Sequence, residues 1–167
     1  MAATKNAQNI RNDTKEFITT ALIELLKKDA LQDISISRVA SKAGVSRMAF
    51  YRNFDTLEQI LYEYYEPRIK SVFEKMRNTS DESVKLNVHF GFCEDIILSY
   101  KHGYEKIIND IFTKQVENFY GADNYHITFI AAGAYAVWKK WLLGGKKVPL
   151  EEVIHIFNIF GEVVPKP

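Results

Sequence analysis

Apolar side chains recur at helical spacing along almost the whole chain. Between Asp13 and Lys28 they fall three or four residues apart, which gathers them on one side of a helix. Eight glycines and four prolines in 167 residues leave few places where a helix must stop. The pattern predicts an all-α fold, whose later helices cover residues 81–100, 104–112, 113–120, 125–143 and 149–161.

The run from Ile34 to Phe54 predicts two short helices, over residues 36–43 and 47–53, joined by a turn at Gly44. Glycine takes the left-handed conformation that ends a helix and reverses the chain. Ser46 is a natural N-cap for the second helix, and Ala40 is small where that helix must cross the first. This is a helix-turn-helix, in which the second helix enters the major groove of DNA.

Two domains follow from this assignment. With the helix over residues 13–28, the helix-turn-helix forms an N-terminal three-helix domain that we place at residues 1–60. Asp55 and Glu58 predict a capping box at the start of a long fourth helix, which reaches Arg77 and contains Pro67, where a kink or a break is expected. This helix leads into a C-terminal helical bundle, residues 61–167.

Charge and composition narrow the function classes. Residues 1–54 carry nine basic and five acidic side chains, whereas residues 55–167 carry thirteen basic and sixteen acidic ones. A basic head on a mildly acidic body suits contact with phosphates. One cysteine excludes an internal disulfide, and no stretch reaches the roughly 20 apolar residues of a membrane helix. A cytoplasmic protein without a signal peptide or membrane partner is expected.

The helix-turn-helix residues resemble the tetracycline-repressor (TetR) family of transcriptional regulators. The matching residues are Val39-Ala40, Gly44-Val45-Ser46, Phe50-Tyr51, Arg52-Asn53, Phe54 and Glu58-Gln-Ile-Leu61. The resemblance covers about residues 10–62, and it is looser at Phe129–Gly145, which is similar to the penultimate helix of many short members. One departure is Leu57, at a position where the family commonly has a phosphate-binding lysine.

The resemblance implies a DNA-binding surface, with Ser35, Ser46 and Tyr51 as phosphate contacts. Arg47 lies in the first turn of the inserted helix, where a guanidinium can bind guanine O6 and N7 together; holding a phosphate is the alternative. Met48 and Ala49 could contact thymine methyl groups. The remaining candidates are helix caps, phosphate partners or solvated polar groups: Ser37, Arg38, Lys42, Arg52 and Asn53.

Regulators of this shape usually bind an effector in the helical body. Aromatic residues are dense there, and most of them must be core. Polar groups among them are better candidates for directing a small apolar or aromatic effector. The candidate pocket comprises Tyr65, His89, Cys93, Tyr104, Phe112 and His126. His89 and Cys93 have metal-ligand spacing, but two ligands do not make a site, so no metal or cofactor is expected.

A dimer interface is predicted in the last two helices. Small residues at 131–134 and 136 allow close helix approach, and tryptophans dominate many interfaces. The candidates are Phe129, Gly133, Ala136, Trp138, Trp141, Ile156 and Phe160. The alternative is an ordinary internal helix. Two helix-turn-helix units related by a two-fold axis read a palindrome, so the expected partners are double-stranded operator DNA and a second copy.

The leading interpretation is therefore a homodimeric repressor that binds a palindromic operator under the control of an effector. The alternative is a DNA-binding module whose body docks a partner protein. An enzyme is not expected, because no Ser-His-Asp arrangement, phosphate-binding Gly loop, metal-ligand set or carboxylate pair occurs in a recognisable context.

Overall fold

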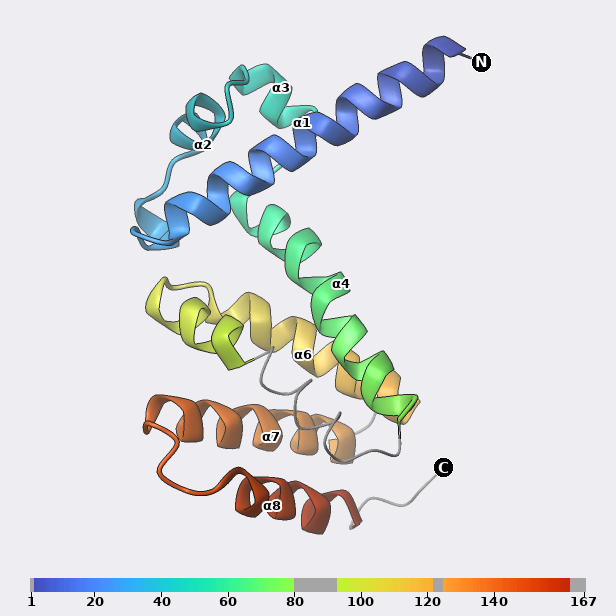
Figure 1. Cartoon of the computed structure of the whole chain (residues 1–167), viewed down its shortest axis with the longest axis vertical. Coiled ribbons are helices and arrows are strands. Elements are labelled where there is room, and N and C mark those ends of the chain that lie inside the picture. The colour runs from blue at the N-terminus through green and yellow to red at the C-terminus, as the bar shows by residue number, and fades with distance from the viewer. Residues whose placement is uncertain (1, 80–92, 122–124, 163–167) are drawn as a thin grey trace. The chain divides into compact units, whose positions relative to one another are not determined.

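The computed structural model describes residues 2–79, 93–121 and 125–162, and every regular element in these ranges is a helix (Figure 1). The chain divides into two compact units. The first unit contains Met1–Tyr64 and Lys101–Tyr104, and the second contains Tyr65–Tyr100 and Glu105–Pro167. The predicted boundary at residue 60 falls four residues before the observed one. The return of Lys101–Tyr104 to the first unit was not predicted.

The first unit contains α1 (Ala2–Leu26), the 3₁₀ turn η1 (Leu31–Asp33), α2 (Ile36–Lys42) and α3 (Arg47–Tyr51). Helix α1 begins eleven residues earlier than the apolar pattern indicated. Its buried face packs against α2, and α2 in turn contacts α3. The core is mainly aliphatic and includes Ile18, Leu22, Val39, Phe50 and Ile60, each fully buried.

The segment Lys101–Tyr104 completes the first unit through two polar contacts. The Leu31 backbone N–H donates to the His102 carbonyl oxygen at 2.8 Å. The His102 ring nitrogen Nδ1 lies 3.0 Å from the Asp29 carbonyl oxygen, to which a protonated Nδ1 donates. Gly103 permits the turn, because its φ of 76° is a conformation that side chains with a Cβ rarely adopt. Backbone groups of the link between α1 and α2 are thus paired with residues about 70 positions away.

Helix α4 (Leu57–Arg77) begins in the first unit and continues into the second. Its cap differs from the prediction: Thr56 Oγ1, rather than Asp55, accepts the first-turn N–H, from Gln59 (3.1 Å). Gln59 Oε1 in turn accepts the Asp55 N–H (2.8 Å). The capping box therefore lies one residue later than predicted. The helix is not broken at Pro67.

The second unit contains a helical segment over residues 93–101, of which 93–100 lie in this unit, with α6 (Glu105–Tyr120), α7 (Tyr125–Leu143) and α8 (Leu150–Glu162). Helix α6 is continuous where two pieces were predicted, since no glycine or proline separates Phe112 from Thr113. The bounds of α7 are those predicted. Most of the predicted helix at 81–100 lies outside the described residues.

Helix α7 packs against both α6 and α8, as Figure 1 shows. It ends at Gly144-Gly145, where Gly145 has a φ of 80° and the Lys146 N–H donates to the Trp141 carbonyl (2.9 Å). Aromatic rings fill much of this core, including Phe112, Tyr135 and Trp138. Within the described part of the chain, no helix has both the length and the apolar character needed to cross a membrane.

Candidate nucleic-acid interface

The turn between α2 and α3 has the hydrogen bonds of a Schellman motif. The Val45 N–H donates to the Ala40 carbonyl (3.0 Å), and the Gly44 N–H donates to the Ser41 carbonyl (3.2 Å). Gly44 has a φ of 68°, as the sequence predicted for this position. These bonds satisfy the last carbonyls of α2 and fix the direction in which α3 begins.

Ser35 and Ser46 are helix caps in the structure. Ser35 Oγ accepts the Arg38 N–H (3.2 Å), and Ser46 Oγ accepts the Ala49 N–H (3.1 Å). Each hydroxyl uses a lone pair in this bond and keeps its proton free to donate to another group. Ser37 is not a cap, since it lies inside the first turn of α2, where it is exposed.

Helix α3 has one buried side chain and a broad exposed face. Phe50 is fully buried, with its ring 6.3 Å from that of Phe54, which orients the helix. On the opposite side, Met48 is 65% exposed and Tyr51 is 46% exposed. We call the exposed residues of this helix and its C-cap the α3 face; they are Arg47, Met48, Tyr51 and Arg52. Ala49 is half-buried beside it.

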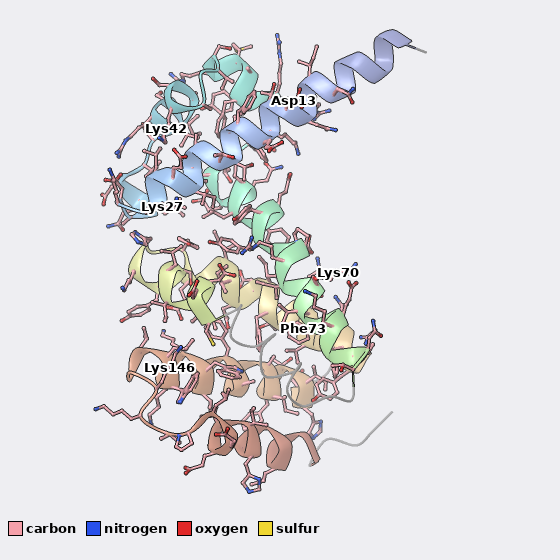
Figure 2. All side chains as sticks on the ribbon, viewed as in Figure 1. Asp13, Lys27, Lys42, Lys70, Phe73 and Lys146 are labelled. Atoms are coloured by element: carbon pink, nitrogen blue, oxygen red, sulfur yellow. The ribbon has the colours of Figure 1, made fainter. Side chains whose placement is uncertain are left out.

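The basic candidates differ in their partners. Arg38 forms an ion pair with Asp29 and Lys42 with Glu24, each at 2.7 Å; Lys42 is labelled in Figure 2. The hydrogen bond from Lys42 lowers the pKa of Glu24 and its charge lowers it further, so the Glu24 carboxyl is ionised at neutral pH. Arg47 and Arg52 have exposed side chains without an ion pair in the described part of the chain. These two are the cations most available to an external anion.

Asn53 is a correction to the predicted surface. It is 9% exposed, and its Nδ2 donates to the Ala49 carbonyl at 2.7 Å. The side chain thus stabilises the end of α3 from the inside. Its Oδ1 is buried and has no hydrogen-bond partner among the described residues. Asn53 is not positioned to contact a phosphate.

Leu57, which replaces a common lysine, is the first residue of α4 and is 8% exposed. It lines an open pocket of about 410 Å³ in the first unit, together with Leu31 and Ile34. Asp55 and Glu58 also line this pocket. The start of α4 is therefore apolar and acidic, so it offers no cationic side chain to a DNA backbone.

The predicted effector residues that the structure describes are divided between the two units. Tyr65, Cys93 and Phe112 are buried in the second unit, and burial raises the pKa of the Cys93 thiol to about 11. Tyr104 is buried but belongs to the first unit, and His126 is exposed. His89 lies outside the described residues. No cluster of three or more potential metal ligands occurs among the described residues.

Polar groups that sequence reasoning missed lie in the core of the second unit. They are Ser99, Gln115 and Tyr135, none more than 5% exposed. Gln115 could have been found from the sequence, because it interrupts the apolar stripe of α6 formed by Ile108, Ile111, Phe112 and Val116. Tyr135 could not have been found in this way, because an aromatic residue at helical spacing indicates only that the side chain belongs to the core.

The two tryptophans of α7 are not on the surface. Trp138 is 4% exposed and Trp141 is 9% exposed, with ring centroids 5.5 Å apart. Trp141 Nε1 donates to the Val148 carbonyl (2.7 Å), which fixes the link to α8. Their prediction as interface residues is wrong for this chain, because the contacts that bury them come from within it.

The remaining interface candidates are exposed where they are described. Phe129 is 69% exposed, Ile156 is 37% exposed, and Gly133 and Ala136 are exposed as well. The Phe160 side chain lies outside the described residues. Helical spacing puts Tyr125, Phe129, Ala132, Gly133, Ala136 and Leu143 on one side of α7. We call these residues, with Ile156 and Ile159 of α8, the α7–α8 face.

No protein-family model matches the chain, and no curated protein matches it. Solved structures do. A TetR transcriptional regulator from Rhodococcus sp. RHA1 is similar with a TM-score of 0.57 and 13% identity, over 91% of this chain and 95% of that one. A tetR-family transcriptional regulator from Streptomyces coelicolor is similar with a TM-score of 0.54 and 15% identity, over 89% and 83%. The chain has the all-α fold of the TetR-family transcriptional regulators.

Proposed function

We propose that this chain is a DNA-binding transcriptional regulator that acts as a homodimer and responds to a small effector. The α3 face is the observation that carries the proposal. A five-residue helix and its C-cap, fixed by a serine N-cap and by buried Phe50, present two arginines, a tyrosine and a methionine outward. Arginine binds guanine edges and phosphates, and a methionine side chain suits the thymine methyl group.

The partners of the basic residues support different roles for them. Arg47 and Arg52 can meet DNA without breaking an ion pair, whereas Arg38 and Lys42 must first leave Asp29 and Glu24. We assign base reading to Arg47, because it starts α3, and backbone contact to Arg52. The hydroxyl protons of Ser35 and Ser46 remain available for phosphate oxygens.

Dimerisation through the α7–α8 face accounts for its exposure. Apolar side chains rarely gather on an exposed surface unless something covers them. Ala132, Gly133 and Ala136 would allow a partner helix to approach closely, with Phe129 and Tyr125 packing beside it. A two-fold dimer would present two α3 faces, which need a separation of about 34–36 Å to occupy successive major grooves.

Selection of bound sequences from randomised double-stranded DNA tests the proposal. The expected outcome is a two-fold symmetric motif, with half-sites about one helical turn apart. The same selection with an Arg47→Ala, Arg52→Ala double variant should lose that motif. Recovery of a pool indistinguishable from the input would refute DNA recognition. Recovery of a single half-site would support DNA recognition and contradict the proposed dimer.

We further propose that the chain is a repressor whose DNA binding is controlled by an effector. An effector that binds better to one arrangement of the chain than to another shifts the population between the two, and so changes DNA affinity. Docking of a partner protein on the body is the second candidate, and the exposed α7–α8 face favours it only if the chain is monomeric. Light scattering at micromolar concentration decides between the two.

A further inference from the structure

The open pocket of the first unit has the size of a small-molecule site. Its volume of about 410 Å³ lies within the range of about 300–1,000 Å³ that such sites occupy. Its lining comes from three stretches of chain: residues 31–36 around η1 and the start of α2, residues 55–58 at the start of α4, and Gly103. All three belong to the first unit. A Cβ at Gly103 would meet no atom within 4 Å, so the returning segment leaves the space beside it open.

One wall of this pocket is aliphatic. Leu31, Ile34 and Leu57 line it and are between 6% and 9% exposed, and Ile36 beside them is half-buried. No aromatic ring is among the described residues that line the pocket. An apolar group that enters it would leave water for contact with these side chains, which favours binding.

Two carboxylates accompany the aliphatic wall. Asp55 and Glu58 line the same pocket, and both side chains are exposed. Neither forms an ion pair within the described part of the chain. No lysine, arginine or histidine is among the described lining residues. The pocket therefore combines an apolar surface with negative charge that no neighbouring cation balances.

The start of α4 could instead attract an anion, because the first N–H groups of a helix usually do so. Here part of that capacity is already used. Thr56 Oγ1 accepts the Gln59 N–H (3.1 Å), and Gln59 Oε1 accepts the Asp55 N–H (2.8 Å). With these N–H groups paired and two carboxylates beside them, the pocket disfavours an anion and favours a cation. The contribution of the charge is modest and salt-dependent, because both carboxylates are exposed.

We propose that the pocket of the first unit binds a small organic cation with an apolar body, such as an arylalkylammonium ion. The apolar body lies against Leu31, Ile34 and Leu57, and the ammonium group lies beside Asp55 and Glu58. None of the lining residues is among the effector residues that the sequence suggested. The inference goes beyond the proposed function, since this site needs neither DNA nor a dimer.

Three probes test the site. Phenethylammonium carries an apolar body and a charge, 2-phenylethanol carries nearly the same body without the charge, and N-acetyl-lysinamide represents a basic side chain of a partner protein. Amide chemical shifts of the full chain are followed by NMR as each probe is added. The test variant is Asp55→Asn with Glu58→Gln. The matched control is Asp13→Asn with Glu16→Gln, since these two residues of α1 are exposed and do not line the pocket; Asp13 is labelled in Figure 2.

The wild type and the control variant should bind phenethylammonium about three- to tenfold more tightly than 2-phenylethanol, because only the first probe meets the carboxylates with a charge. The shift changes should concentrate at residues 31–36, 55–58 and 102–104. In the test variant the two probes should bind about equally. Raising the salt concentration to about 0.5 M should reduce the preference in the wild type. Unchanged amide shifts outside the pocket show that the test variant is folded.

Equal binding of the two phenyl probes by the wild type overturns the site, as does a preference that survives in the test variant. Saturable shifts that are absent with phenethylammonium, or that lie elsewhere in the chain, also overturn it. Tighter binding of N-acetyl-lysinamide would assign the pocket to a partner protein. Pocket shifts that change with protein concentration alone would assign it to a second copy. Either result contradicts the proposal. These measurements contain no DNA, so the selection experiment is judged separately.

Discussion

Arg47 and Arg52 lie at opposite ends of α3, and their surroundings separate their proposed roles. Arg47 starts the helix, next to the Ser46 cap. Arg52 is the C-cap, and its carbonyl oxygen accepts from Arg11 Nη2 of α1 at 3.4 Å. A side chain in the first turn of an inserted helix reaches base edges, whereas one at the far end reaches the DNA backbone.

Arg47→Ala should weaken binding to the selected DNA more than binding to random DNA, by about 1–3 kcal/mol of discrimination. Arg52→Ala should weaken both equally and lower the slope of log K against log salt by about one. Binding titrations at several salt concentrations measure both effects. Lys70→Ala is the control, since Lys70 is exposed on the part of α4 in the second unit and pairs only loosely with Glu74 (3.8 Å). Equal losses on the two DNAs for Arg47→Ala would remove its reading role.

The Cys93 thiol should react slowly with alkylating reagents in the folded chain. It is 3% exposed, and burial raises the pKa of its thiol to about 11, so little thiolate forms at pH 8. Its alkylation by iodoacetamide at pH 8 should be at least about a hundredfold slower in native protein than in denaturant. Rates that agree within tenfold would show that this part of the core opens readily.

For single residues, the sequence predicted the features that depend on neighbouring positions in the chain. The Ser35 and Ser46 caps and the buried Phe50 follow from neighbours within a few positions. Trp138 and Trp141 show the limit, because a tryptophan on an apolar helix is equally consistent with a core and with an interface. Which of the two holds depends on segments more distant in the sequence, such as Val148, whose carbonyl accepts from Trp141.

Among the elements, the turn between α2 and α3 depends on the backbone of one residue. A Cβ at Gly44 would meet no atom within 4 Å, so the cost of Gly44→Ala is conformational, and it should be about 1–2 kcal/mol. A Cβ at Gly133 would also meet no atom within 4 Å, but Gly133 lies inside α7, where glycine is less favourable than alanine. Gly133→Ala should therefore stabilise the monomer by about 0.5–1 kcal/mol. Urea unfolding of the two variants, at concentrations at which the chain is monomeric, should give opposite signs, and a shared sign would contradict this account.

The α7–α8 face gives the next prediction at this scale. Phe129→Glu places a charge at the centre of its apolar side chains, and it should convert the dimer to a monomer in sedimentation or light scattering. Asn118→Glu, on the exposed side of α6, should leave the oligomeric state unchanged. A dimer that survives Phe129→Glu must form through another surface.

The helices themselves were largely predictable, because periodicity and breakers are local signals. Helix α7 ends where Gly144-Gly145 indicated, whereas α6 is one continuous helix where two pieces were predicted. The cap of α4 shifted by one residue, because Asp55 and Thr56 are both good caps and the geometry of Gln59 favours the second.

For the whole molecule, the main finding is that the first unit is not one continuous stretch of chain. Lys101–Tyr104 belongs to it, although the residues on both sides belong to the second unit. Nothing local in the sequence indicates this, since the Leu31–His102 hydrogen bond spans about 70 positions. The predicted residues 1–60 therefore omit part of the structure that they were meant to describe.

A fragment of residues 1–64 should be less stable than the same residues in the full chain. The Leu31 N–H loses its acceptor in such a fragment, and its hydrogen exchange should become much faster. The Val45 N–H, which donates to the Ala40 carbonyl, is the internal reference. Equal protection of Leu31 in the fragment and in the full chain would show that the His102 contact is dispensable.

The return of Lys101–Tyr104 also limits how this protein could be recombined. Grafting only residues 1–64 onto the body of another regulator would leave the Asp29 carbonyl and the Leu31 amide facing an unrelated loop. A working chimera should have to carry His102 and Gly103 across as well, so that the transferred piece arrives as two stretches of chain.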